Sequence, residues 1–257
     1  MKFSRLHRIY TNIKLIENYS LNLAEDHSHY LKTVLRLKVG DHFRIFNGTD
    51  GEFIAQITGM TKNNLHVGLT NILRKATVEP ELTLGISIIK SDRMLDAIDM
   101  AVQLGVTKII PLIAERSQFR TVNTQRLMKC IIESTEQSER LIPCILMPVV
   151  SLSLFLEQTL GSSIIYANEN EDEDENNTLL KIMPIYSSDI SANLSVVVGP
   201  EGGFSQNELQ ILSLRPNTLS ISLGSNILRT ETAVATCLAQ IKLLTASCVA
   251  TKPILLN

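Results

Sequence analysis

The chain has 257 residues, a formal net charge of −2, 44% hydrophobic and 19% charged residues, a composition typical of a globular protein with one or two domains. No apolar run is long enough to cross a bilayer, and the first residues lack the apolar core of a signal peptide, so we expect a cytoplasmic protein and no membrane partner. The four cysteines stand far apart without a Cys-x-x-Cys pair, which argues against a metal or redox site.

Charge is unevenly distributed along the chain. Residues 1–75 hold eleven Lys and Arg against six Asp and Glu, whereas the segment 169–175 holds six acids. The basic N-terminal part fits either an RNA partner or an ordinary solvated surface. The acidic run is typical of a solvated loop.

The first part of the chain predicts a small β-barrel. Residues 41–46 and 52–57 alternate around a Gly-containing turn, which indicates a hairpin, and residues 65–70 supply a further strand. Residues 29–37 have apolar positions at helical spacing. We place this domain at residues 1–74, with a linker over 75–81.

From residue 75 to residue 257 the pattern changes to alternating strands and helices, which predicts an α/β domain. Strands are expected over 82–89, 106–113, 162–167, 196–198 and 218–223. Helices are expected over 92–104, 123–140 and 230–247, with Gly105 ending the first of them.

Two of these strands run into glycine turns. The valines 196–198 are followed by Gly-Pro-Glu-Gly-Gly at 199–203, and Ser205 with Glu208 forms a capping box that predicts the next helix start. The strand 218–223 runs into Gly224 and then a long final helix. Such turns at the carboxyl end of a sheet can hold a small molecule, although one βα turn alone would look similar.

The two turns together resemble the signature of the RsmE family of ribosomal RNA methyltransferases. The matching stretches are Gly-Pro-Glu-Gly-Gly (199–203) and Leu-Gly-x-x-Ile-Leu-Arg-Thr-Glu-Thr-Ala (223–233). Weaker matches are Arg-Ile-Tyr at 8–10, His29 with Val-Leu-Arg at 34–36, Glu-Arg-Ser at 115–117 and Glu-Gln-Ser-x-Arg at 136–140. Residues 102–106 lack the acid that the family carries there.

The resemblance implies a PUA-like barrel that grips RNA, followed by a knotted α/β domain of the SPOUT class. This domain would bind S-adenosylmethionine, work as a homodimer and methylate N3 of a uridine near the decoding region of small-subunit ribosomal RNA, in the assembled subunit or as free RNA. Another SPOUT enzyme that methylates ribose or transfer RNA, or a silent RNA-binding assembly factor, are the alternatives.

The resemblance and the local patterns nominate three sets of site residues. The cofactor set comprises Ala167, Gly199, Gly202, Gly203, Leu223, Gly224, Ile227 and Leu228. The RNA-binding set comprises Arg8, Lys32, Arg36, Arg116, Gln137 and Arg140, of which Gln137 and Arg140 should lie one helical turn apart. Surface charge or a complement to the helix dipole is the alternative for the basic residues.

Catalysis is assigned to three charged residues near the turns. N3 of uridine carries a proton, which must leave or whose loss must be stabilised. Arg229 is expected to stabilise that charge, with Glu201 or Glu231 as possible bases. Alternatively, Arg229 forms a salt bridge with one of these acids and only shapes the loop.

The final helix predicts a dimer contact. Val234, Cys237, Leu238, Ile241 and Leu244 form one broad apolar face. Burial of that face within a single chain is the alternative.

Overall fold

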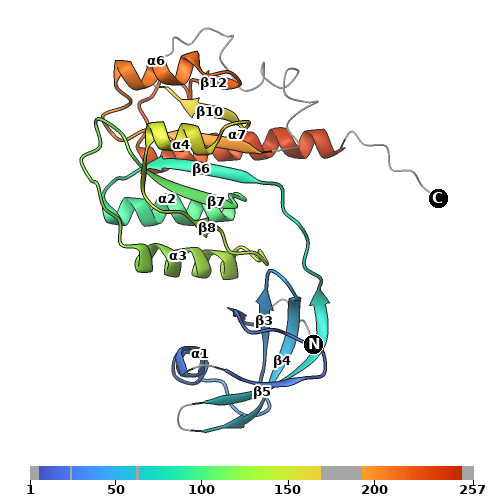
Figure 1. Ribbon diagram of the computed structural model, residues 1–257. Helices are drawn as coiled ribbons and strands as arrows, with labels where there is room; N and C mark the ends of the chain where they lie inside the picture. The colour runs from blue at the N-terminus through green and yellow to red at the C-terminus, as the bar shows by residue number, and fades with distance from the viewer. Residues whose placement is uncertain (1–5, 24, 62–63, 169–192, 251–257) are drawn as a thin grey trace, which may run out of the picture. The chain divides into compact units, whose positions relative to one another are not determined.

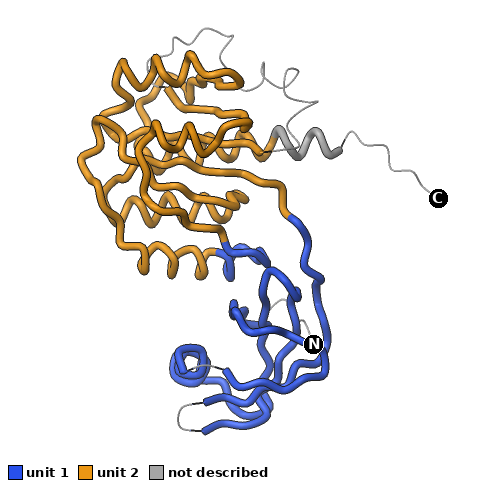
Figure 2. The backbone as a smooth tube through the Cα atoms, viewed as in Figure 1, with its two compact units in different colours: residues 1–78, 135–143 blue, residues 79–134, 144–257 orange. Residues whose placement is uncertain are grey.

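The computed structural model describes residues 6–23, 25–61, 64–168 and 193–250, with backbone only for 244–250. The acidic run 169–175 lies outside the described residues. The chain packs as two compact units, Met1–Val78 with Thr135–Pro143, and Glu79–Ser134 with Cys144–Asn257 (Figure 2). The predicted boundary at 74/75 placed residues 135–143 in the second domain, but here this segment packs with the first unit.

Unit 1 is built on a five-stranded sheet in the order β1-β3-β4-β5-β2. Its strands are β1 (Arg8–Tyr10), β2 (Ser20–Leu23), β3 (His42–Asn47), β4 (Gly51–Met60) and β5 (Leu65–Arg74). The hairpin expected over 41–57 is confirmed as the antiparallel pair β3–β4. Among the described strands β1 and β2 do not pair, so the sheet is a half-barrel.

The helix expected over 29–37 is wrong in its bounds. The structure instead has a short α1 (Glu25–His29), followed by the π-turn η2 (Tyr30–Val34). Leu31 of this turn is fully buried in the core of unit 1, and Arg36 adopts a left-handed backbone with φ +56°. One buried leucine therefore anchors the turn, and the left-handed residue ends it before a regular helix can extend.

A buried carboxylate organises the arginines of unit 1. Glu52 accepts from Arg8 Nε at 2.6 Å and from Arg74 Nε at 2.7 Å, and its Oε1 lies 3.6 Å from Arg44 Nη1. Arg44 also pairs with Glu139 at 2.8 Å, a bond that holds the pKa of Glu139 below its usual value. Segment 135–143 thus joins unit 1 through charged contacts.

Unit 2 contains a parallel sheet in the order β12-β10-β11-β6-β7-β8 (Figure 1). Its strands are β6 (Leu82–Ser87), β7 (Lys108–Ile113), β8 (Ile145–Leu146), β9 (Val150–Ser151), β10 (Ser163–Ala167), β11 (Leu194–Val198) and β12 (Thr218–Ile221). Its helices are α2 (Ser91–Gln103), α3 (Thr124–Gln137), α4 (Leu152–Gln158), α6 (Gln206–Leu214) and α7 (Thr230–Ala250), the end of α3 belonging to unit 1.

Helices cover both faces of this sheet. Val196 and Val198 of β11 pack into the cluster that contains α2, α3 and α7, whereas Val197 packs into the cluster that contains α4 and α6. The strand is therefore apolar on both sides, as a buried parallel strand should be. The predicted α/β class is confirmed. Gly105, with φ +98°, stands directly after the end of α2 and stops that helix as predicted.

The apolar face of α7 lies inside its own chain. Val234, Cys237 and Leu238 are fully buried and Ile241 is 3% exposed, all within the core of unit 2. The side chain of Leu244 is outside the described part. Using this face to predict a dimer was wrong, because strands and α2 of the same unit already cover it.

Candidate functional site

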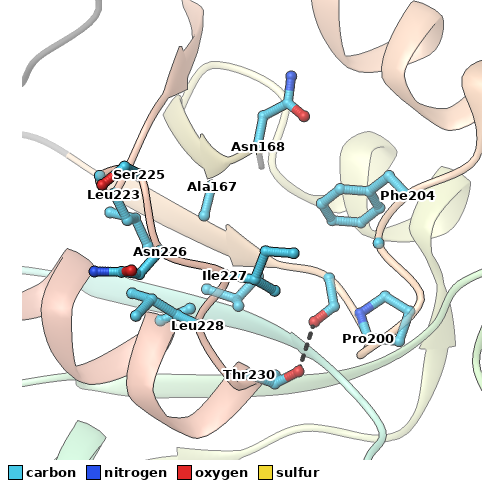
Figure 3. Close-up of a pocket in the computed structure, with 15 residues that line it drawn as sticks. Ala167, Asn168, Pro200, Phe204, Leu223, Ser225, Asn226, Ile227, Leu228 and Thr230 are labelled. Carbon is cyan, nitrogen blue, oxygen red and sulfur yellow. Dashed lines mark hydrogen bonds between the residues drawn. The ribbon is translucent and has the colours of Figure 1, made fainter. Parts of the chain in front are cut away.

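The carboxyl ends of β10, β11 and β12 form a pocket in unit 2 (Figure 3). Ala167 and Asn168 come from the end of β10, and Val198 to Pro200 come from the end of β11. The segment after β12 contributes Leu223 to Leu228. Of the eight residues expected to bind the cofactor, seven line this one pocket: Ala167, Gly199, Gly203, Leu223, Gly224, Ile227 and Leu228.

The first glycine turn is held by backbone and side-chain hydrogen bonds. The N–H of Gly203 donates to the carbonyl of Pro200 at 2.9 Å, and Gly203 has φ +65°, a conformation that favours glycine. The predicted capping box is confirmed, since the N–H of Glu208 donates to the hydroxyl of Ser205 at 3.1 Å and the N–H of Ser205 donates to Glu208 at 2.9 Å. The turn is therefore fixed directly before α6.

The second glycine turn is tied to the first by one buried threonine. The Thr230 hydroxyl donates to the carbonyl of Gly199 at 3.2 Å, the dashed line in Figure 3. Gly224 has φ +108°, so the chain can fold back before α7. Ile227, which follows it, is 86% exposed at the pocket mouth. Sequence reasoning missed Thr230 as well as Asn168, Phe204, Ser225 and Asn226, which also line the pocket.

Gly202 does not line the pocket. Its carbonyl accepts from Arg116 Nη1 at 3.0 Å, and a Cβ added to Gly202 would meet Arg116 Cβ at 3.4 Å. That distance is an ordinary van der Waals contact, so Arg116 packs against the turn without requiring a glycine at position 202. The exposed Arg116, which was expected to bind RNA, supports the cofactor turn with part of its guanidinium.

The described lining of the pocket is uncharged. It combines apolar walls from Phe204, Leu223 and Ile227 with the amides of Asn168 and Asn226 and the hydroxyls of Ser225 and Thr230. Without a lysine or arginine in the described lining, a phosphate group fits poorly. A flat heterocycle with a polar edge and a cationic centre fits these walls and the backbone groups of the turns.

Arg93 of α2 holds the two acids that were proposed as bases. Its Nη1 lies 3.1 Å from Glu201 Oε1, and its Nε lies 3.9 Å from Glu231 Oε1. The alternative in which Arg229 pairs with one of these acids is wrong. Arg229 is exposed, and within the described ranges its side chain has no ion pair. The sequence around α2 contains no pattern that predicts this role of Arg93, because its two partners lie more than a hundred residues away in the chain.

Arg8 is unsuited to the RNA contact expected of it. It is 7% exposed, lies over the Phe46 ring at 4.1 Å, and donates to Glu52 and to the carbonyls of Thr135, Glu136 and Arg140. Burial lowers its pKa from the ordinary value. Its donors are committed inside unit 1, so we assign Arg8 a structural role.

Apart from Arg116, which belongs to unit 2, the other members of the RNA-binding set all belong to unit 1. Lys32 is half-buried and donates to the carbonyl of Thr61 at 3.1 Å, while Arg36 is exposed. Gln137 is exposed and Arg140 is half-buried, but they are not one helical turn apart. The helix ends at Gln137, and Glu139 between them has φ +59°.

Neither a metal site nor a reactive thiol is visible in the part of the chain that the structure describes. No group of three His, Cys, Asp or Glu residues there could hold a metal ion. Burial raises the pKa of Cys237 to about 12, which leaves the thiol protonated and inert. No helix among the described residues is long and apolar enough to cross a bilayer.

Comparisons with known proteins extend over nearly the whole chain. A family model described as an RNA methyltransferase domain matches residues 77–242, and another described as an RNA methyltransferase PUA domain matches residues 23–70. The chain is 51% identical to the ribosomal RNA small subunit methyltransferase E of Rickettsia conorii, over 95% of this chain and 98% of that protein. The protein of the same name from Synechocystis sp. is 29% identical, over 95% and 80%.

Solved structures agree with these matches. The ribosomal RNA small subunit methyltransferase E from Neisseria gonorrhoeae bound to S-adenosyl methionine is similar at a TM-score of 0.80, with 26% identity over 93% of this chain and 98% of that one. A methyltransferase from Legionella pneumophila in complex with its cofactor SAM gives 0.79, with 28% identity over 95% and 98%. The two domain matches and the 51% identity, together with the pocket, show that this chain belongs to the ribosomal RNA small subunit methyltransferase E family.

Proposed function

We propose that the protein transfers a methyl group from S-adenosylmethionine to N3 of a uridine in 16S ribosomal RNA. The observation that carries this is the pocket in which both glycine turns meet, with no charged residue in its described lining and with Arg229, which has no ion pair among the described residues, directly after its Ile227-Leu228 wall. The two solved relatives named above contain the same cofactor. When bound, this cofactor supplies an electrophilic methyl group on a sulfonium.

The residues of this chain would hold the reactants and stabilise charge. The turns at 199–203 and 223–228 would read the adenosine through backbone groups, with Leu223 and Ile227 as apolar walls. Correct positioning of the two reactants can lower a barrier by roughly 7–11 kcal/mol. Arg229, with its guanidinium free of ion pairs in the described chain, would donate to a uracil oxygen as N3 loses its proton.

Glu231 is the better of the two candidate bases. Its Oε2 is buried and has no hydrogen-bond partner among the described residues. Glu201 is more exposed, and its Oε1 accepts from Arg93. We therefore propose that Glu231 removes the proton from N3, whereas Glu201 is held by its ion pair with Arg93.

The partners follow from family membership. We propose that unit 1 grips ribosomal RNA in the assembled small subunit, in the cytoplasm, with Lys32, Arg36, Gln137 and Arg140 as candidate contacts. The homodimer and the SPOUT knot that the resemblance implies stay predictions, and the buried face of α7 gives the dimer no support.

The test combines product identification with a variant at Arg229. Small subunits from cells that lack the enzyme are methylated in a single turnover, and the modified nucleoside is identified by mass spectrometry. Arg229→Ala should lose about a hundred- to thousandfold in rate and keep its affinity for S-adenosylmethionine in calorimetry. Lys129→Ala, on the exposed face of α3, is the matched control.

Three results would contradict the proposal in different ways. A rate of Arg229→Ala within a few-fold of the wild type would remove Arg229 from the chemistry. A methyl group on ribose would favour a ribose-modifying enzyme. Binding of RNA by the wild-type protein without any methyl transfer would favour an assembly factor.

A further inference from the structure

A second hollow in unit 2 lies at the carboxyl ends of β6 and β7. Strand β6 pairs in parallel with β11, so the hollow beyond the carboxyl end of β6 and the cofactor pocket beyond that of β11 lie at the same edge of the sheet. Its volume is about 210 Å³, whereas one water needs only about 10–15 Å³. It is formed by the junction of β6 with α2 and by the segment that leads into α3.

The interior of the hollow is apolar, and an aromatic ring stands at its wall. Ile89, Met94 and Leu127 line it and are at most 3% exposed. Phe119 also lines it but is 40% exposed. The other described phenylalanines, Phe43, Phe46, Phe53, Phe155 and Phe204, are at most 5% exposed, so Phe119 is the described phenylalanine that is open to a ligand.

The rim of the hollow is cationic. Lys90 lines it, is exposed and has no ion pair in the described ranges, whereas Arg120, which follows Phe119, lines a different hollow. Arg126 also lines the hollow, but its guanidinium is paired with Asp92 at 3.1 Å and donates to Ser91 at 3.1 Å. Lys90 is therefore the one cation of the described lining that has no ion pair.

An exposed aromatic ring beside a lysine that has no ion pair among the described residues suits one ligand class in particular. Single-stranded RNA presents unstacked bases, which stack on aromatic side chains, and phosphates, which bind Lys and Arg. An apolar peptide would not use the cations, and a free anion would not use the ring.

We propose that this hollow binds an unstacked nucleotide of the RNA substrate next to the acceptor, with its base on Phe119 and its phosphate on Lys90. The inference rests on the proposed function and adds a second RNA contact at the edge of the sheet that carries the cofactor pocket. It assigns RNA recognition to unit 2 itself, in addition to the PUA domain.

The test separates the ring from the charge. Phe119→Leu keeps apolar bulk but removes the aromatic face, and Phe119→Tyr restores that face. Loss of one stacked base should raise KM for small subunits by roughly five- to 150-fold in Phe119→Leu, with rescue in Phe119→Tyr. Lys90→Ala should reduce the salt slope of binding to a short uridine oligonucleotide by about 0.7. Lys129→Ala is again the charge control.

Affinity for S-adenosylmethionine should be the same in all these variants, because none of the changed residues lines the cofactor pocket. Unchanged KM in Phe119→Leu, or failure of Phe119→Tyr to restore it, would overturn the nucleotide site. Normal binding of oligonucleotide with a defect only on assembled subunits would indicate a protein contact and would equally overturn it. These outcomes leave the proposed function standing, since that depends on the product formed by the wild type.

Discussion

Arg93 is the residue on which the geometry around the cofactor pocket depends most. It lies on α2, yet its guanidinium reaches Glu201 in the first glycine turn and Glu231 at the start of α7. Together with the bond from Thr230 to Gly199, it connects the two segments that bound the pocket. All three side chains of this cluster are partly exposed, so each ion pair should stabilise the fold by less than about 1 kcal/mol.

We therefore expect Arg93→Met to affect the reaction more than the stability. The two acids would lose their common partner and move apart, and a displacement on the order of 1 Å can cost about a hundredfold in rate. Arg93→Lys should recover part of the loss, because an ammonium can contact either acid but lacks the planar fork. Single-turnover rates and urea unfolding curves of both variants test this, and a rate loss matched by an equal loss of stability would contradict it.

The sequence identified the glycine-turn residues but not the network that holds them. Glycines, the capping box and the Ile-Leu-Arg stretch are local signals, and seven of eight nominated cofactor residues line one pocket. Arg93 and Arg116 act across 108 and 86 residues, which no local pattern reports. Arg8 was misread for the same reason, because its charge is visible in the sequence but its burial against Glu52 is not.

At the scale of elements, the segment between β12 and α7 forms an exposed wall of the pocket. Ile227 is 86% exposed while lining the pocket, so its side chain contributes little to the core.

The alternation of apolar residues and the positions of the glycines predicted the strands and helices around this segment well. They failed at residues 29–37, where one buried leucine and a left-handed arginine replace a regular helix.

Ile227→Ala should weaken cofactor binding without affecting folding. The change removes three carbons, each worth about 0.8 kcal/mol when buried by a ligand, so affinity for S-adenosylmethionine should fall by up to about fiftyfold. Leu160→Ala, an exposed leucine in the same unit but outside the described pocket lining, is the matched control. Calorimetry measures both, and an unchanged affinity in Ile227→Ala would place the cofactor away from this wall.

At the scale of the whole molecule, each unit has a hydrophobic core of its own. The core of unit 1 contains Ile9, Phe43 and Ile45, and that of unit 2 contains β6, β11, α2 and α7. All described residues that line the cofactor pocket belong to unit 2. Stability of unit 1 and cofactor binding should therefore be separable by mutation.

Glu52 is the position at which to separate them. Its side chain is 1% exposed and faces three arginines, of which Arg8 and Arg44 are also buried. Removing one partner of a buried ion pair typically costs about 3–5 kcal/mol, because a charge is left without compensation. Glu52→Gln should destabilise unit 1 by that amount, whereas Glu133→Gln, which changes an exposed pair on α3, should be close to neutral.

Hydrogen exchange followed by mass spectrometry would report the two units separately in the full-length protein. In Glu52→Gln, peptides from β3, β4 and β5 should lose protection, while peptides from β6 and β11 keep it. The variant should bind S-adenosylmethionine with the affinity of the wild type, since no described residue of unit 1 lines the pocket. Methylation of small subunits should fall sharply, because the RNA contacts that we propose for unit 1 require that unit to be folded. Equal loss of protection in both units would instead show that the two cores unfold as one cooperative system.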